Sequence, residues 1–405
     1  MIALPMPPMA SAGVHVLLSP AHSGLQRSLR QLCRDSGAVP RQGWKRTATV
    51  LGLSASLSSL LLRGRRGADT RTCNSRCVRR CQPTTLFDGQ GDKFEVRDLG
   101  DKGKGMVATQ HIERGELLML DEPLATWPGS LDDALDDVDA WNLQILDSVA
   151  RCSPKGQAQF WALHDAHTEE GEPKTALGII LSNYHATGGG QEACSGVFPN
   201  APLFNHSCVP NVVHTWRDHG LPGAEDSMAI RALVDIEPGE ELCVSYLNLY
   251  MRRAERQEEL TPRYGFQCGC PACSLTGDAF AASDKRRTEL RELDRVLPMM
   301  ADLDELSEMM GDLKVVVSKA AVLIDQELRG HAQMKCRLYN DAVQLAGLAE
   351  DESLTSEMAR LAVESSKVAH GPESERTLQL QRCVENPKDC LKILFGGQSE
   401  GEDDL

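Results

Sequence analysis

Aromatic residues are scarce in this 405-residue sequence: Phe, Trp and Tyr together make up 4% of it. No run of eighteen or more apolar residues occurs, which argues against a typical membrane-spanning helix. The fourteen cysteines are too few for a disulfide scaffold of this length, but they are enough for a metal site. Hydrophobic residues at 41% and charged residues at 25% are ordinary for a chain that buries a core.

Acidic residues are nearly missing from the N-terminal part. Residues 1–86 contain thirteen Lys and Arg but only Asp35 and Asp69, whereas residues 87–405 carry a net charge of −26. A basic, Ser-rich, acid-poor arm is typical of an organelle transit peptide and equally typical of a disordered arm without an address. The compartment therefore stays open between nucleus, cytoplasm and organelle. The acidic body favours cationic partners, and no direct nucleic-acid binding is expected of it.

Short strands are predicted from residue 94 onward. Residues 94–97 alternate in polarity, and apolar runs at 106–109 and 116–120 are also typical of strands. The turn HIERGE at 111–116 is nearly repeated as DIEPGE at 235–240, and each copy leads into an apolar run. Two such units predict a small mixed β fold built of short strands.

Two further regions are predicted to be helical, so the expected class is α+β. Residues 131–185 begin with the acidic segment DDALDDVDA, as helix N-termini prefer, and a Gly- and Pro-rich loop is expected at 186–204. After Cys273 the chain is expected to form about five or six helices in antiparallel hairpins. The helical spacing there is carried by residues such as Leu290, Leu293 and Leu297.

The sharpest chemical signal is the spacing C-x-C-x2-C of Cys268, Cys270 and Cys273. Three thiolates within six residues, in a turn made by Gly and Pro, match a tetrahedral zinc site. The candidate fourth ligand is Cys208, inside the segment NHSCVPN at 205–211. Four thiolates would leave no open position, so this zinc would be structural. A redox cluster or a chance cluster is the alternative.

Four motifs in order resemble a SET-domain protein methyltransferase with a cysteine-rich post-SET segment. They are GKGMVATQHIERGELLMLDEPL at 103–124, NHSCVPN at 205–211, ELCVSY at 241–246 and YGFQCGCPACS at 264–274. The basic stretch LYMRRAERQEELTPRYGF at 249–266 is similar to the SMYD-like branch of that family. A MYND zinc finger interrupts the SET domain in that branch. Residues 125–203 contain only Cys152 and Cys194, so we expect a SMYD-like protein that lacks the finger.

The composition of the two ends and the resemblance between them together divide the chain into five parts. They are an N-terminal arm at 1–86, a SET domain at 90–250 with a helical insert at about 125–203, a post-SET zinc segment at 251–275, a helical TPR-like domain at 276–395 and an acidic tail at 396–405.

The resemblance also implies an activity and the residues that carry it. The implied reaction is S-adenosylmethionine-dependent N-methylation of a lysine in a histone or non-histone protein, with one structural zinc. Tyr246 matches the family's catalytic tyrosine and Tyr264 a second channel tyrosine. The implied cofactor-binding residues are Lys104, Gly105, Asn205, His206 and Phe266, and the implied zinc ligands are Cys208, Cys268, Cys270 and Cys273. The alternative is an inactive SET scaffold that serves as a protein-interaction module.

Overall fold

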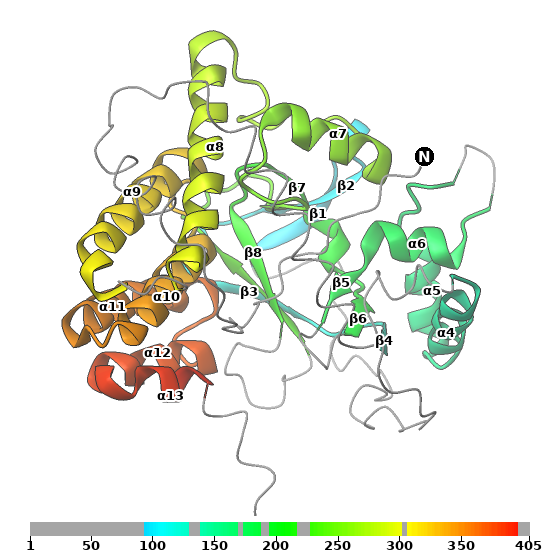
Figure 1. Cartoon of the computed structure of the whole chain (residues 1–405). Coiled ribbons are helices and arrows are strands. Elements are labelled where there is room, and N and C mark those ends of the chain that lie inside the picture. Colours follow the sequence, from blue (N-terminus) through cyan, green and yellow to red (C-terminus); the bar gives the residue numbers. More distant parts are fainter. Residues whose placement is uncertain are drawn as a thin grey trace, which may run out of the picture. The chain divides into compact units, whose positions relative to one another are not determined.

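The structure, a computed structural model, describes residues 93–128, 138–168, 173–187, 194–216, 227–301 and 306–395 (Figure 1). The predicted basic arm, the acidic tail and the acidic segment that precedes residue 138 lie outside the described residues. Within these ranges the chain forms small sheets of short strands and two groups of helices, which confirms the α+β class.

The strands pair in four small sheets within the described ranges, with the orders β1-β2, β10-β7, β3-β9-β8 and β4-β6-β5. All pairs are antiparallel except β10 with β7. The buried faces of the first three sheets share one core that includes Met106, Phe204 and Ile230. The strands are β1 (Phe94–Asp98), β2 (Lys104–Ala108), β3 (Leu117–Asp121), β4 (Ala125–Pro128), β5 (His185–Ala186), β6 (Cys194–Val197), β7 (Asn205–His206), β8 (Val212–Trp216), β9 (Met228–Ala232) and β10 (Cys243–Val244).

The two near-copies of the turn sequence pair with each other. Ile112 and Ile236 occupy the same position in HIERGE and DIEPGE, and each amide donates to the other's carbonyl at 3.0 Å. Gly115 and Gly239 also correspond, and both have positive φ, at 87° and 91°, a conformation that L-residues with a Cβ rarely adopt. The repeated sequence thus reflects two equivalent turns that meet through a reciprocal bridge.

The insert contains three separate helices where one helical region was predicted. They are α4 (Val138–Ala150), α5 (Pro154–Ala162) and α6 (Ala176–Asn183). Ser153 caps α5 by accepting from the Gly156 amide, and Thr175 caps α6 by accepting from the Gly178 amide, so each helix restarts at its own N-cap. The expectation of a loop over 186–204 is wrong in part. Strand β6 lies there because it pairs with both β4 and β5. The short 3-10 helix η5 (Ala201–Leu203) lies in the same stretch.

The region after the cysteines is helical, as predicted. Helix α7 (Arg253–Tyr264) precedes the cysteine motif, and six α-helices follow it in the described residues, with α10 packed on α11 and α11 on α12 (Figure 1). Within the described part of the chain, no helix has the length and apolar character that crossing a membrane requires. The six are α8 (Gly277–Met300), α9 (Met310–Leu328), α10 (Ala332–Leu348), α11 (Glu352–Ala369), α12 (Glu375–Glu385) and α13 (Cys390–Phe395).

Candidate functional site

Backbone pairing brings together two motifs that are far apart in the sequence, NHSC and SY. Strand β7 runs parallel to β10, and the Ser207 amide donates to the Val244 carbonyl at 2.8 Å. Asn211 extends this contact. Its side-chain oxygen accepts from the Cys243 amide at 2.7 Å, and its side-chain nitrogen donates to the Glu241 carbonyl at 2.9 Å. The two motifs are therefore held in one register.

The side chain of Asn205 is fixed in one orientation by two acceptors. Its amide nitrogen donates to the Glu241 carboxylate at 2.8 Å and to the Lys104 carbonyl at 3.2 Å. The other oxygen of the same carboxylate accepts from the Lys102 ammonium at 2.6 Å, which raises the pKa of Lys102. With both donors of the Asn205 amide engaged, its oxygen is the group that can accept a hydrogen bond from a ligand.

Gly105 lies against the same amide. A Cβ at this position would stand 2.5 Å from the Leu99 Cδ1 atom and 2.7 Å from the Asn205 side-chain nitrogen. The resemblance implied that this glycine is a cofactor-binding residue. The structure adds a reason for the glycine itself, because even an alanine would displace the Asn205 amide. The side chain of Lys104 is exposed beside it.

Four rings gather next to Asn205, and we call His206, Tyr246, Tyr264 and Phe266 the aromatic cluster. Ring centroids are 5.0 Å apart for Tyr246 and Tyr264, 5.3 Å for His206 and Tyr246, 6.2 Å for His206 and Phe266, and 6.5 Å for Tyr264 and Phe266. Tyr264 ends α7, and Gly265 reverses the chain with φ 76°, so that Phe266 returns to the same group. All four rings were predicted to be site residues, and they lie together.

Both tyrosines of the aromatic cluster are neutral phenols at physiological pH. Burial raises the pKa of Tyr246 well above its usual value and raises the pKa of Tyr264 to about 12. The Tyr246 hydroxyl donates to the Phe204 carbonyl at 3.0 Å. Its oxygen therefore keeps its lone pairs for an incoming donor such as an amine.

His206 connects the aromatic cluster to the cysteines. Its Nδ1 accepts from the Tyr246 amide at 3.0 Å, which requires that the proton be on Nε2. Nε2 lies 3.3 Å from the Cys208 sulfur. Burial lowers the pKa of this imidazole to about 4, so the ring is neutral. An imidazole with this tautomer donates to the sulfur and does not act as a base toward it.

The four predicted cysteines meet, and we call Cys208, Cys268, Cys270 and Cys273 the cysteine cluster. All four sulfurs lie within 4.8 Å of one another, and Cys208 is 3.8 Å from Cys268 and 3.5 Å from Cys273. A tetrahedral zinc with Zn–S bonds of about 2.3 Å would set sulfur atoms roughly 3.8 Å apart. The donor set and its spacing therefore fit a structural zinc ion.

Helix α7 supports the cysteine cluster from one side. The buried Arg256 guanidinium donates to the Met251 carbonyl at 2.6 Å and lies 3.6 Å from the Cys273 sulfur. Hydrogen bonds from Cys208 and Cys268, with a contribution from Arg256, lower the pKa of Cys273, whereas hydrogen bonds from the other three thiols raise the pKa of Cys208. The Arg256 charge thus favours the thiolate at Cys273, the form that binds metal.

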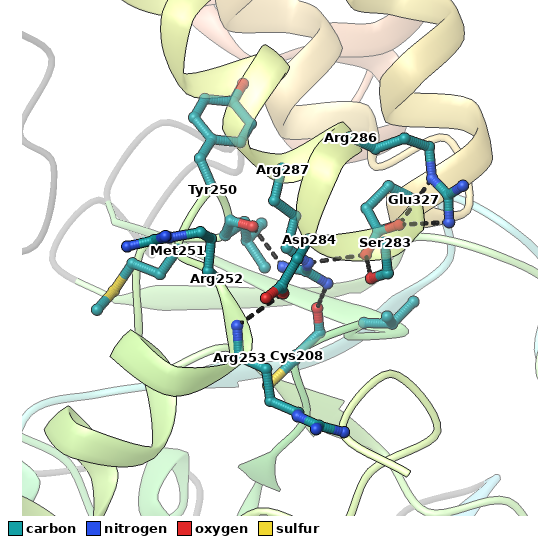
Figure 2. Close-up of polar contacts among 12 residues, drawn as sticks. Cys208, Tyr250, Met251, Arg252, Arg253, Ser283, Asp284, Arg286, Arg287 and Glu327 are labelled. Atoms are coloured by element: carbon teal, nitrogen blue, oxygen red, sulfur yellow. Dashed lines mark hydrogen bonds and ion pairs between the residues drawn. The ribbon is translucent and has the colours of Figure 1, made fainter. Parts of the chain in front are cut away.

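The C-terminal helices support the cysteine cluster from another side through Arg287 on α8. This side chain is fully buried, and it donates to the Cys208 carbonyl at 3.0 Å, to the Leu249 carbonyl and to the Glu327 carboxylate on α9 at 2.7 Å. Figure 2 shows Arg287 between Cys208 and Glu327, with Ser283 and Arg286 on the same carboxylate. The Arg287 guanidinium thus links the loop that contains Cys208 to helices α8 and α9.

Two of these supporting residues, Arg287 and Glu241, were not predicted from the sequence. Arg287 stands three residues before Leu290 and so falls on the apolar stripe of its helix, where a charge must be paired. A charged residue on an apolar stripe was the sequence feature that could have identified Arg287 as a buried, paired residue. Glu241 sits within the motif ELCVSY, but nothing local indicates that its carboxylate holds an amide from another strand.

Comparison with known proteins identifies the domain that contains Asn205, His206, Cys208 and Tyr246. The family model described as "SET domain" matches residues 103–247. Histone-lysine N-methyltransferase set5 of Schizosaccharomyces pombe is 28% identical over 73% of this chain and 84% of its own length. Human N-lysine methyltransferase SMYD2 is 36% identical over 24% of this chain, but the match spans only 20% of SMYD2. A solved structure, the SET domain of LSMT bound to lysine and AdoHcy, aligns with 74% of this chain and 88% of its own at 15% identity and a TM-score of 0.28. Residues 103–247 of this chain are a SET domain, in a sequence similar to set5 and, over a shorter stretch, to SMYD2.

Proposed function

We propose that this protein is an S-adenosylmethionine-dependent protein-lysine N-methyltransferase. The observation that carries the proposal is the aromatic cluster, in which His206 and Tyr246 of the SET domain meet Tyr264 and Phe266 of the segment that follows it, beside the fixed Asn205 amide. The relatives named as lysine methyltransferases support the same reaction.

We assign the cofactor to the Asn205 side of the site. S-adenosylmethionine, when bound, supplies a methyl group on a sulfonium. Asn205 and His206, with the backbone of Lys104 and Gly105, would hold its methionine end, and the Asn205 oxygen is oriented to accept from an ammonium. Phe266 would stack on the adenine, because aromatic faces pack well on one another.

We assign the lysine to the two tyrosines. A lysine ammonium has a pKa of about 10.4 and must lose its proton before it can attack a methyl carbon. Half-buried phenol rings remove water from the amine and lower the cost of that loss. The Tyr246 oxygen would accept from the amine and align its lone pair, while the bond from nitrogen to methyl carbon forms and that carbon leaves sulfur. The released proton leaves to solvent.

We assign a structural role to a zinc in the cysteine cluster. Four thiolates would fill its coordination and leave no position for substrate. Its effect on the site would be to fix Cys208, two residues after His206, against the segment that supplies Phe266.

Two measurements on the zinc-loaded protein test the proposal. Calorimetry measures S-adenosylmethionine binding, and transfer of a labelled methyl to lysine peptides measures activity. Tyr246→Phe is expected to keep cofactor affinity within a few fold and to lose about a hundredfold or more in rate. Phe266→Ala is expected to weaken cofactor binding about tenfold. Tyr339→Phe, in α10, is the control and should change neither quantity.

The outcomes separate the two candidate functions. Binding with transfer that depends on Tyr246 supports the enzyme. A folded, zinc-loaded protein that binds no S-adenosylmethionine would refute it and favour the inactive SET scaffold.

A further inference from the structure

An arginine stands at the edge of the two-tyrosine site. Arg263 precedes Tyr264 in the last turn of α7, and its guanidinium carbon is 5.1 Å from the Tyr264 ring centroid. It also lies 5.9 Å from the ring centroid of Tyr184, at the C-terminal end of α6, and donates to the Tyr184 hydroxyl at 3.3 Å. The side chains of Arg263, Tyr184 and Tyr264 are all half-buried, so this group borders both the site and solvent.

Arg263 has fewer polar partners than the other arginines of its helix, and among the described residues none of its partners is a carboxylate. Arg252 pairs with Glu255, Arg253 donates to two carbonyls and lies over the Phe280 ring, and the Arg256 contacts are given above. Glu259 is one turn before Arg263, yet the two form no ion pair within 4.0 Å. Within the described part of the chain, most donors of the Arg263 guanidinium therefore have no acceptor and can bind a ligand.

The chemistry of this position favours an anion. A guanidinium presents parallel N–H groups that fit a carboxylate with two hydrogen bonds. A substrate lysine alone would bring a second positive charge to the same place. An acidic side chain on the substrate removes that repulsion and satisfies the donors. The pair would sit at a half-buried edge, where water screens it less than on an open surface.

The distances limit where the acid lies on the substrate. The Tyr246 ring is 5.0 Å from the Tyr264 ring, so the guanidinium is within about 10 Å of the Tyr246 ring. An extended peptide advances about 3.3–3.6 Å per residue. Lysine and acidic side chains that enter the site side by side keep about this separation at their backbone, so an acid that reaches Arg263 is within about three residues of the lysine.

We propose that Arg263 is a specificity-determining residue that selects substrates with an Asp or Glu within three residues of the methylated lysine. This inference rests on the proposed function, since it assumes that the lysine enters between Tyr246 and Tyr264. The acidic body led us to expect a basic substrate. The role of Arg263 adds that this substrate also carries one acidic residue near the methylated lysine.

The test uses peptides with one central lysine and neutral flanks. Each of the six flanking positions is set in turn to Glu or to the isosteric Gln. The zinc-loaded full chain is expected to show about tenfold higher kcat/KM for Glu at one position, mainly through KM. Arg263→Gln should remove this preference while the rate on the Gln peptide and the affinity for S-adenosylmethionine stay within twofold. Arg263→Glu should reverse the preference, so that Lys at that position is favoured over Gln.

Controls and refuting outcomes are built into the same experiment. Arg252→Gln, on the N-terminal end of the same helix and paired with Glu255, should keep the preference. Calorimetric binding of the Glu and Gln peptides is measured beside turnover. A Glu preference in binding without any turnover supports the role of Arg263 and refutes the enzyme. Equal rates and equal binding for Glu and Gln at all six positions refute the role of Arg263, whatever the activity.

Discussion

The buried arginine between the zinc loop and the helices gives the most direct test of the structure. In Arg287→Met, the Cys208 and Leu249 carbonyls lose their shared donor, and the Glu327 carboxylate, whose side chain is 4% exposed, loses one of its two cations. Breaking a buried ion pair by removing one partner costs about 3–5 kcal/mol. Because Arg286 and Ser283 still contact the carboxylate, we expect a loss near the lower figure, about 3 kcal/mol of unfolding free energy.

Urea unfolding of the zinc-loaded protein at about 25 °C measures this loss. Arg286→Met is the matched control, since this side chain is on the same helix, pairs with the same carboxylate and is 28% exposed. It should cost less than about 1 kcal/mol. The double variant Arg287→Met/Glu327→Met removes the buried charge together with its partner and should recover part of the loss. Equal effects of the Arg287 and Arg286 substitutions, or a double variant less stable than Arg287→Met, would refute the reasoning.

Three further predictions follow from features of the site and the core. Native mass spectrometry should find one zinc per chain, and its removal by a chelator should lower the urea midpoint, whereas an unchanged midpoint would exclude a structural ion. Gly105→Ala should weaken S-adenosylmethionine binding by about 1–3 kcal/mol, because the added methyl displaces the Asn205 amide; calorimetry checks it. Burial lowers the pKa of His331 to about 4, from about 6.5 when unfolded, so the unfolded chain binds more protons between these values. Stability should therefore fall from about pH 6.5 towards pH 4, by about 2 kcal/mol at pH 5 from this group, in urea titrations. His331→Asn, which keeps an N-cap acceptor, should make that dependence less steep by the share of this one group.

The parts of the site that the sequence predicted depend on short-range patterns. The C-x-C-x2-C spacing fixes three ligands within one turn, and the NHSC motif supplies the fourth member of the cysteine cluster. Helical periodicity likewise predicted the helices after Cys273, because each helix buries one stripe of its own residues.

The parts that were missed depend on partners distant in sequence. Strand β6 has the sequence CSGV, which has little intrinsic preference for a strand, and it is extended because β4 and β5 pair with both of its edges. The role of Glu241 depends on an amide from β7, and that of Arg287 on a carbonyl of the zinc loop. No local pattern encodes such contacts, since the partner is chosen only when the tertiary structure forms.

The link from Arg287 to Cys208 also has a consequence for folding during synthesis. Cys268 follows Cys208 by 60 residues, Arg287 follows it by 79, and Glu327 comes 40 residues after Arg287. At about 5–20 residues per second, roughly 6 to 24 seconds of synthesis separate the first zinc ligand from the carboxylate that neutralises its supporting arginine. For about the first half of that interval Cys208 lacks its three partner cysteines, and until its end the buried Arg287 lacks its carboxylate. The nascent chain therefore carries the Cys208 loop without its complete support until α8 and α9 have been synthesised.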